Sequence, residues 1–554
     1  MFVVFEGIDG SGKTTLSDRV AGILAQSSVT AFHARPSGEL KSKLASRIRD
    51  MARDPRTLTM SPHTELLLYL ARDCQMIDTV IRPALDNAQV VIADRYVYSP
   101  GILCRARGLV EESDIQKATE LVARGLWPDL VIYCDVDIHT SDRRKKLDKI
   151  VNRRDPDDFG RKGLRGLGLR RAMRDDYLRM AKENPTWMTV DNVNHSITEN
   201  SHLIANRILA HLGFSEIEMP GNLPLPVAMA PISADKPCAD LFYDFLDRLV
   251  EEGYARMALY HARSLDDERA WKLRETHMLR EPEITATGLE PLGDERAIAM
   301  RRALLKMAPR HVAISLKSIW AETSDVAWEM RNRLADVAPL EVAASMNRLD
   351  SDNAFALREK LWAEKDARGA VLSSLRGIDT PRAWEMRARA DKKKNTWGLL
   401  ESLSGIDTER AWEIRNQHMT NHLPWVIVSL EGIDTRAAWD IRYRLETQAT
   451  KLVVRSLGTV LTDEAFDLRD RQGSWDKETL ATIKGIDHLR AWKLREQLMA
   501  VWPGYVAKSV GLTLGQTPRG IAFMKQLAHQ CPSDPDVAHY MVKLETVTKD
   551  LPNA

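Results

Sequence analysis

A glycine-rich loop that contains a lysine and a threonine lies close to the start of the chain. It has the sequence Gly7-Ile8-Asp9-Gly10-Ser11-Gly12-Lys13-Thr14, and Thr15 follows it. Glycines let a backbone turn so tightly that its N–H groups surround a phosphate. The lysine ammonium can then reach the outer phosphates, and the threonine hydroxyl is a ligand for Mg²⁺. The spacing predicts a binding site for a nucleoside triphosphate.

A second group of charged residues follows the apolar run Val90–Ala93 and has the sequence Asp94-Arg95-Tyr96. A carboxylate at the end of a strand beside a phosphate loop is placed to organise Mg²⁺ and its waters or an acceptor group. The adjoining arginine can bind a second phosphate. Two phosphate-binding features favour transfer between two nucleotides over simple hydrolysis. The alternative is a surface ion pair at the end of a strand.

A basic segment runs from Arg143-Arg144-Lys145-Lys146 to Lys182 and is interrupted by glycines at 160, 163, 166 and 168. Such a segment suits a lid that closes over phosphates, adds positive charge and excludes water from the reaction. The alternative is a helix whose basic side chains are only solvated.

Five short apolar runs predict the strands that position these residues. They are separated by stretches long enough for crossover helices, which favours a parallel sheet. We therefore expect an α/β domain over residues 1–215 with helices on both faces of a five-stranded sheet. The expected strands are Phe2–Phe5, Val29–His33, Val90–Ala93, Leu130–Cys134 and Trp187–Val190.

A proline-rich stretch over residues 216–237 reads as a linker, and the chain beyond it, 238–554, repeats itself. The clearest copies begin Gly-Ile-Asp at Gly377, Gly405, Gly432 and Gly485 and continue to Ala-Trp-x-x-Arg. A degenerate tenth copy, Thr517–Ile521, is expected to be a terminal cap. The nine other copies end at arginines spaced 26 to 30 residues apart: Arg274, Arg301, Arg331, Arg358, Arg387, Arg415, Arg442, Arg469 and Arg495.

The repeat has the features of two short helices joined by turns. Glycine ends one helix in a left-handed turn, and aspartate is expected to cap the next. Stacked units of this size predict an all-α solenoid of about nine to ten two-helix repeats. The recurring arginine has three interpretations. It could form a structural ladder, in which each guanidinium contacts a helix-end carbonyl, a neighbouring carboxylate or the Trp face. It could instead line a groove for an anionic ligand, or form a protein-binding surface. The repeat tryptophans are expected in the core.

Composition narrows the class of protein. A chain of 554 residues is too long for a single hydrophobic core and suits two or more domains. Its 79 basic and 78 acidic side chains nearly balance, so a nucleic-acid partner is disfavoured. Apolar runs fall short of the roughly 20 residues that cross a bilayer, so no membrane partner is expected. Five scattered cysteines without a C-x-x-C pair indicate reduced thiols in a cytoplasmic protein, without zinc.

The first 215 residues or so resemble thymidylate kinases, in the superfamily of P-loop nucleoside monophosphate kinases. The resemblance rests on the loop from Phe5 to Thr15, on Asp94-Arg95-Tyr96, and on Trp127-Pro128-Asp129-Leu130 with the following Asp135-Val136-Asp137. It implies a transferase that uses ATP and Mg²⁺ and accepts a deoxynucleoside monophosphate, dTMP first. We recognise no family in the repeats.

The resemblance also implies roles for individual residues. Lys13 and Thr14 would serve the donor triphosphate, and Asp9 would face the acceptor sugar. Asp94 and Arg95 would serve the metal region and the acceptor phosphate. Thr14 and Asp94 are the expected metal ligands.

Arg35 matches another acceptor-phosphate arginine of the family, and Tyr69 matches the aromatic residue that stacks on the base. The family places a catalytic arginine in the loop or in the lid. Because this loop has none, Arg153 and Arg154 are the candidates, with Arg143 and Arg144 behind them.

The base pocket departs from the family pattern. The family's base-reading arginine, four residues after the aromatic, aligns with Asp73, while an arginine stands one position earlier at Arg72. One residue along a helix turns a side chain by about 100°. The chain also has Gly101-Ile102-Leu103-Cys104 where the family often has a Tyr-Gln pair.

We therefore expect an ATP-dependent kinase whose solenoid binds an unknown protein partner. The alternative is a nucleotide-dependent switch, or a specialised kinase for which the solenoid recruits a partner. Family members commonly dimerise through helices that flank the sheet, so a homodimer is also implied, unless the appended repeats block that contact.

Overall fold

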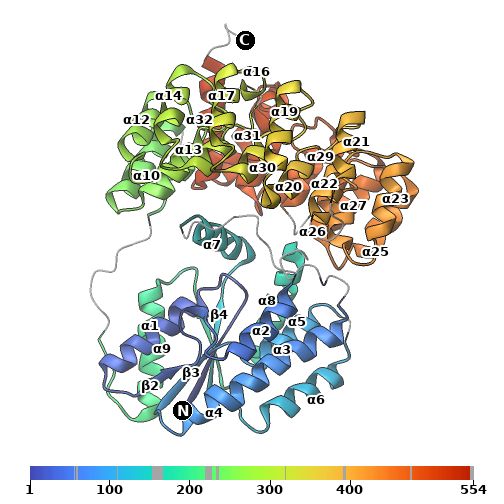
Figure 1. Cartoon of the computed structure of the whole chain (residues 1–554). Coiled ribbons are helices and arrows are strands. Elements are labelled where there is room, and N and C mark those ends of the chain that lie inside the picture. Colours follow the sequence, from blue (N-terminus) through green and yellow to red (C-terminus); the bar gives the residue numbers. More distant parts are fainter. Residues whose placement is uncertain are drawn as a thin grey trace. The chain divides into compact units, whose positions relative to one another are not determined.

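In the computed structural model, the chain forms two compact units, Met1–Pro226 and Val227–Ala554 (Figure 1). The residues that the structure describes are 1–54, 57, 60–108, 110–151, 166–218, 227–232, 236–318, 320–390, 395–473 and 477–549. The boundaries expected from the sequence, 1–215 and 238–554, remain predictions, since parts of the 216–237 linker lie outside these residues. None of the described helices is long and apolar enough to cross a membrane.

A five-stranded parallel sheet forms the centre of the first unit, as predicted, with strand order β2-β3-β1-β4-β5. Val4 pairs with Ala93 on one side and with Val131 on the other, so the ends of β1, β3 and β4 lie together at one edge. The strands are β1 (Phe2–Glu6), β2 (Ala31–His33), β3 (Val90–Asp94), β4 (Leu130–Asp135) and β5 (Trp187–Asp191).

Helices cover both faces of this sheet, also as predicted. In Figure 1, α1 (Lys13–Gln26) and α9 (Ile197–Leu212) lie on one side, and α3 (Pro62–Met76), α5 (Tyr98–Arg105) and α8 (Gly166–Glu183) lie on the other. The first pair buries a continuous core against the strands. The remaining helices are α2 (Lys43–Arg53), the π-helical turn Ile77–Ile81, α4 (Arg82–Leu85), α6 (Glu112–Ala123) and α7 (Ile138–Val151).

The second unit is all-helical, and each repeat contributes two helices. In all but the last of the first helices, the recurring Arg stands three positions after a Trp, Phe or Ile. These helices are α12 (Glu268–His277), α14 (Glu295–Leu304), α17 (Asp325–Leu334), α19 (Asp352–Trp362), α21 (Pro381–Ala388), α23 (Glu409–His418), α25 (Arg436–Leu445), α27 (Asp463–Gly473), α29 (Leu489–Leu498) and α31 (Pro518–Gln530). The second helices each pack on the next: α11 (Ala255–His261), α13 (Pro282–Gly288), α15 (Pro309–Ile314), α18 (Pro339–Ser345), α20 (Arg368–Ser373), α22 (Thr396–Ser402), α24 (Leu423–Val428), α26 (Thr450–Leu457), α28 (Glu478–Thr482) and α30 (Pro503–Gly515). The short helix α16 (Trp320–Thr323) precedes α17.

The last helix of the array packs against the first, so the repeats close on themselves. Helix α32 (Pro535–Lys549) contacts α30 and α10 (Cys238–Glu251). Phe242 and Ala538 share one apolar core, and the Ile232 N–H donates to the Pro532 carbonyl at 2.9 Å. The expectation that the tenth copy is a terminal cap is therefore wrong, because α32 continues the array back to its beginning.

The recurring arginines are buried and bind helix-end carbonyls, which confirms the structural-ladder interpretation. The guanidinium of Arg415 donates to the Leu403, Ile406 and Ser429 carbonyls at 2.8–3.0 Å and to the Ser429 Oγ at 3.0 Å. Its carbon lies 4.9 Å from the Trp412 ring centre. Burial lowers the pKa of Arg415 to about 10, so it stays charged at neutral pH.

The repeat aspartates have a different role from the expected helix cap. The residue that flanks the start of α23 is Thr408, one position after Asp407, and it makes no side-chain cap. Asp407 Oδ1 instead accepts the indole N–H of Trp412 at 2.6 Å, and Asp379 does the same for Trp384 at 2.5 Å. The aspartate therefore orients the tryptophan, which in turn stacks on the buried arginine.

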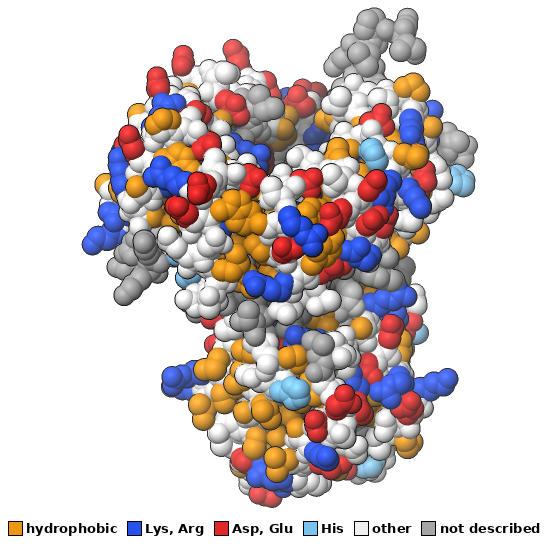
Figure 2. All heavy atoms as spheres, turned by 90° about the vertical axis from the view of Figure 1, so that its right-hand side faces the viewer, with side chains coloured by type: hydrophobic (Ala, Val, Ile, Leu, Met, Phe, Trp, Pro, Cys, Tyr) orange, Lys and Arg blue, Asp and Glu red, His pale blue; other side chains and the backbone are white. Residues whose placement is uncertain are grey.

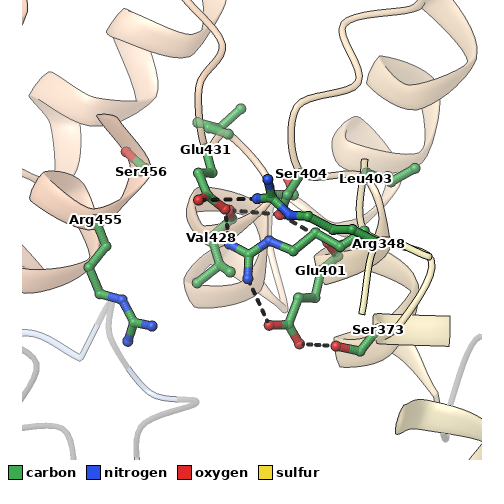
Figure 3. A network of polar contacts seen from close by, with 12 residues as sticks. Arg348, Ser373, Glu401, Leu403, Ser404, Val428, Glu431, Arg455 and Ser456 are labelled. Carbon is green, nitrogen blue, oxygen red and sulfur yellow. Dashed lines mark hydrogen bonds and ion pairs between the residues drawn. The ribbon is translucent and has the colours of Figure 1, made fainter. Parts of the chain in front are cut away.

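Charged side chains from several turns also meet at one point of the array (Figure 3). Glu431 binds Arg376 and lies 3.4 Å from Arg348, 83 positions away in sequence. Glu401 lies 3.6 Å from Arg376 and accepts from Ser373 at 2.7 Å. Because these residues follow or end α18, α20, α22 and α24, the network holds four successive repeats in a tight curve.

We predict that Arg415→Met lowers the free energy of unfolding of the second unit by about 3 kcal/mol, because it removes the buried hydrogen bonds from Arg415 to the Leu403, Ile406 and Ser429 carbonyls. Urea unfolding followed by tryptophan fluorescence would measure it. The control is Arg436→Met, since the Arg436 side chain is 79% exposed and pairs with Asp440 on its own helix. Equal losses in the two variants would contradict the ladder.

Candidate active site

The glycine-rich loop joins β1 to α1 and packs tightly against the neighbouring segments. Gly7 and Gly10 have φ values of 146° and 86°. A Cβ on Gly7 would lie 2.7 Å from the Cys134 carbonyl oxygen, and one on Gly10 would lie 2.5 Å from that of Ser141. Side chains are excluded at both positions, so the loop can keep its backbone close to a bound anion.

Two polar residues that the sequence reasoning missed hold this loop in place. The Ser141 Oγ donates to the Asp9 carbonyl at 2.6 Å, and the Asn192 Nδ2 donates to the Ser11 carbonyl at 2.5 Å. Arg144 in turn donates to the Asn192 carbonyl at 2.6 Å. Their positions just beyond β4 and β5, at the edge where the loop lies, were the only signal in the sequence.

Lys13 lies at the start of α1 and is 6% exposed. Its ammonium donates to the Ile8 carbonyl at 3.1 Å. Burial, with a contribution from Arg95, lowers the pKa of Lys13 to about 8, although Asp94 and Asp9 oppose the shift. The ammonium is therefore charged at neutral pH and poorly compensated, as a group that awaits a phosphate should be.

Thr14 and Asp94 form an oxygen pair between the loop and the end of β3. The Thr14 Oγ1 donates to Asp94 Oδ2 at 2.6 Å, while the buried Asp94 Oδ1 has no hydrogen-bond partner among the described residues. Burial alone would raise the pKa of Asp94, but Lys13, Arg35 and Arg95 together lower it, so it is ionised. A hydroxyl and a carboxylate with a vacant lone pair suit Mg²⁺, which kinases hold by few protein oxygens together with phosphates and water.

Arg95 links the end of β3 to the loop. Its guanidinium donates to Asp9 Oδ1 at 2.5 Å, to the Gly7 carbonyl at 3.1 Å and to Ser99 Oγ at 2.9 Å. The residue has a left-handed φ of 77°. The buried carboxylate of Glu6 lies beneath it and accepts from Ser99 at 2.6 Å. The predicted residues Lys13, Asp94 and Arg95 are thus brought together at one edge of the sheet.

A pocket opens beside Asp94 and Arg95 between the end of β3 and helix α3. Its lining residues are Ala34, Arg35, Leu40, Arg72, Asp73, Met76, Ile81, Ala93, Asp94, Arg95 and Tyr96. Arg35 donates to the Asp94 carbonyl at 3.3 Å and to the Gly38 carbonyl at 2.8 Å. The pocket therefore has a cationic region next to the loop, suited to the phosphate of a second ligand.

The remaining residues predicted for the site differ in how exposed they are. Tyr69 is buried, with the Arg72 guanidinium 5.3 Å from its ring centre. Thr15 is exposed on α1. The lid candidates Arg153 and Arg154 lie outside the described residues. Arg143 is exposed on α7.

Comparison with known proteins gives a consistent result. The sequence model of the family "Thymidylate kinase" matches residues 5–204. Thymidylate kinase of Fervidobacterium nodosum is 30% identical over 194 residues, which are 34% of this chain and 90% of that protein. Thymidylate kinase of Finegoldia magna is 35% identical over 153 residues, which are 27% of this chain and 72% of that protein. Thymidylate kinase of Enterococcus faecalis is 33% identical over 186 residues, which are 33% of this chain and 84% of that protein.

The pKa of Lys13 predicts how nucleotide binding depends on pH. A phosphate binds the protonated ammonium, so affinity for a non-hydrolysable ATP analogue should be constant below pH 8. It should fall above that value, approaching about tenfold per pH unit, as Lys13 loses its proton. Calorimetric titration from pH 6.5 to 9.5 would measure the profile.

The control for this profile is Lys13→Met, which should bind weakly at every pH. A wild-type affinity that stays constant to pH 9.5 would contradict the assignment of Lys13 as a phosphate ligand.

Proposed function

The chain belongs to the thymidylate kinase family, and from this we propose that it catalyses ATP-dependent transfer of a phosphoryl group to dTMP, giving dTDP. The observation that carries the proposal is the pairing of two anion-binding regions at one edge of the sheet. Thr14 of the loop and Asp94 of β3 are 2.6 Å apart, and Asp9 and Arg95 are joined by an ion pair. A donor and an acceptor phosphate bound there would be neighbours.

In this proposal the loop N–H groups and Lys13 hold the outer phosphates of ATP. Thr14 and Asp94 would hold Mg²⁺, which supplies charge neutralisation when bound. Arg95 and Arg35 bind and orient the acceptor phosphate toward the donor. Catalysis then comes mainly from positioning and from cations that face the transferring group.

Arg153 and Arg154 remain our candidates for the lid arginine that completes this charge. Asp9 is proposed to reach the acceptor sugar. In the structure its carboxylate binds Arg95, so a bound acceptor phosphate would compete with Asp9 for the same guanidinium.

We further propose that the repeat unit binds a protein partner. The ladder arginines are buried, so they do not line an anion groove. On the face in Figure 2, basic and acidic side chains are interspersed, which favours a protein over a nucleic acid. The alternative is a switch in which nucleotide binding controls that partner.

We expect Lys13→Ala to lower turnover of dTMP by at least about 10²-fold, because it removes a cation from the transferred charge. Arg95→Ala should mainly raise the KM for dTMP, by about tenfold or more, since it removes charged hydrogen bonds to the acceptor. An ADP-release assay over the common nucleoside monophosphates would measure both.

The control in this assay is Lys117→Ala, whose side chain is exposed on α6 and belongs neither to the loop, nor to the pocket, nor to the basic segment. Its turnover should match the wild type. Absence of acceptor-dependent ADP release with every monophosphate would overturn the kinase assignment.

For the repeat unit, the immobilised full-length protein should retain a partner from a lysate of its own source, and mass spectrometry would identify it. If ATP and dTMP change the amount retained, the switch is supported. Retention that is independent of nucleotide favours a passive recruiting module, and no specific retention contradicts both.

A further inference from the structure

Asp73 is a buried carboxylate in the pocket wall that has only part of its hydrogen-bonding capacity used. The residue is 7% exposed, and its Oδ1 accepts from the Arg72 Nε at 2.7 Å. The Arg72 Nη2 lies 2.5 Å from the same oxygen. The other oxygen, Oδ2, is buried and accepts no hydrogen bond from the described residues.

An ion pair with Arg72 accounts for Oδ1 and leaves Oδ2 unexplained. Burial raises the pKa of Asp73, while Arg72, Arg35 and Arg95 oppose that shift. A buried carboxyl oxygen without a hydrogen-bond partner costs free energy, so such an atom in a native fold calls for a ligand or a functional reason. Here it lies in the wall of a pocket.

The position of Asp73 within the pocket indicates which part of a nucleotide it would meet. The cations Arg35 and Arg95 stand at the phosphate loop, next to Asp94. Asp73 and Arg72 come from α3, a separate wall that also contributes the apolar Met76. A monophosphate bound by Arg35 and Arg95 would direct its base toward that wall.

We infer that Asp73 is a specificity-determining residue that accepts the N3–H of the thymine base through Oδ2, while Arg72 donates to a neighbouring carbonyl of the same base. This inference rests on the proposed function. Thymine presents N3–H between two carbonyl oxygens, and the Arg72–Asp73 pair presents a donor beside an acceptor. The ion pair also fixes the carboxylate, so that Oδ2 is already oriented when the base arrives.

The test compares dTMP with N3-methyl-dTMP, which lacks the N–H. The ratio of kcat/KM for the two acceptors is measured in the wild type and in Asp73→Leu, which keeps the bulk of the side chain but has no acceptor oxygen. The steric effect of the methyl group then acts in both proteins. We expect the wild-type ratio to exceed that of the variant by about 10- to 100-fold, the value of a hydrogen bond to a charged group.

Asp73→Asn retains an acceptor oxygen of the same size and should give an intermediate ratio, which guards against a folding defect in the leucine variant. Asp114→Asn, an exposed carboxylate of α6 that does not line the pocket, should give the wild-type ratio. Equal ratios in the wild type, Asp73→Asn and Asp73→Leu, with dTMP turned over, would overturn this inference alone. Absence of dTMP turnover in the wild type would overturn the proposed function and this inference with it.

Discussion

A guanidinium that leaves water needs acceptors for its N–H groups, and both units of this chain supply them to buried arginines. Among the described residues, the Nη1 groups of some ladder arginines, such as Arg415, are left without one. In the repeats the acceptors are neutral. The C-terminal ends of helices carry partial negative charge and unpaired carbonyls, so they can hold a cation without a carboxylate. From Arg301 onward, the ladder arginines join the second helices on either side of their own helix, as Arg415 joins the turn at Leu403 to that at Ser429. Helices of this length are marginally stable on their own, so these links add to the apolar packing that holds the repeats together.

At the edge of the sheet, a charged carboxylate is among the acceptors of the Arg95 guanidinium. Arg95 is bound by Asp9 and by the Gly7 carbonyl, with Glu6 beneath, so the end of β3 is tied directly to the phosphate loop. Carboxylate partners can be exchanged for phosphate oxygens, whereas helix-end carbonyls are fixed in place. The difference explains why the arginine of the sheet edge is suited to ligand binding and the arginines of the repeats are suited to structure.

The sequence predicted features that depend on neighbours in the chain. The five strands, the loop from Gly7 to Thr14 and the repeat period were correct because periodicity and glycine spacing encode them locally. The sequence did not predict features that depend on contacts between residues far apart in the chain. The hydrogen bond from Asn192 to Ser11 joins residues 181 positions apart, and the packing of α32 on α10 joins residues about 300 positions apart. The expected Asp407 cap failed for a local reason, since helix α23 begins one residue later than the pattern suggested and the indole of Trp412 uses the carboxylate.

Closure of the repeat array changes what its end repeats must do. An open solenoid needs terminal repeats with polar outer faces, because the end units expose one apolar side. Here Phe242 of α10 and Ala538 of α32 cover one another, so each end serves as the neighbour of the other. The curvature that closure requires is fixed partly by the charges on Arg348, Arg376 and Glu431, which lie at the ends of different repeats. Because α10 and α32 join the two ends of the array, opening the array there exposes an apolar face at both ends, and the unit should therefore unfold more cooperatively than a linear stack of the same repeats.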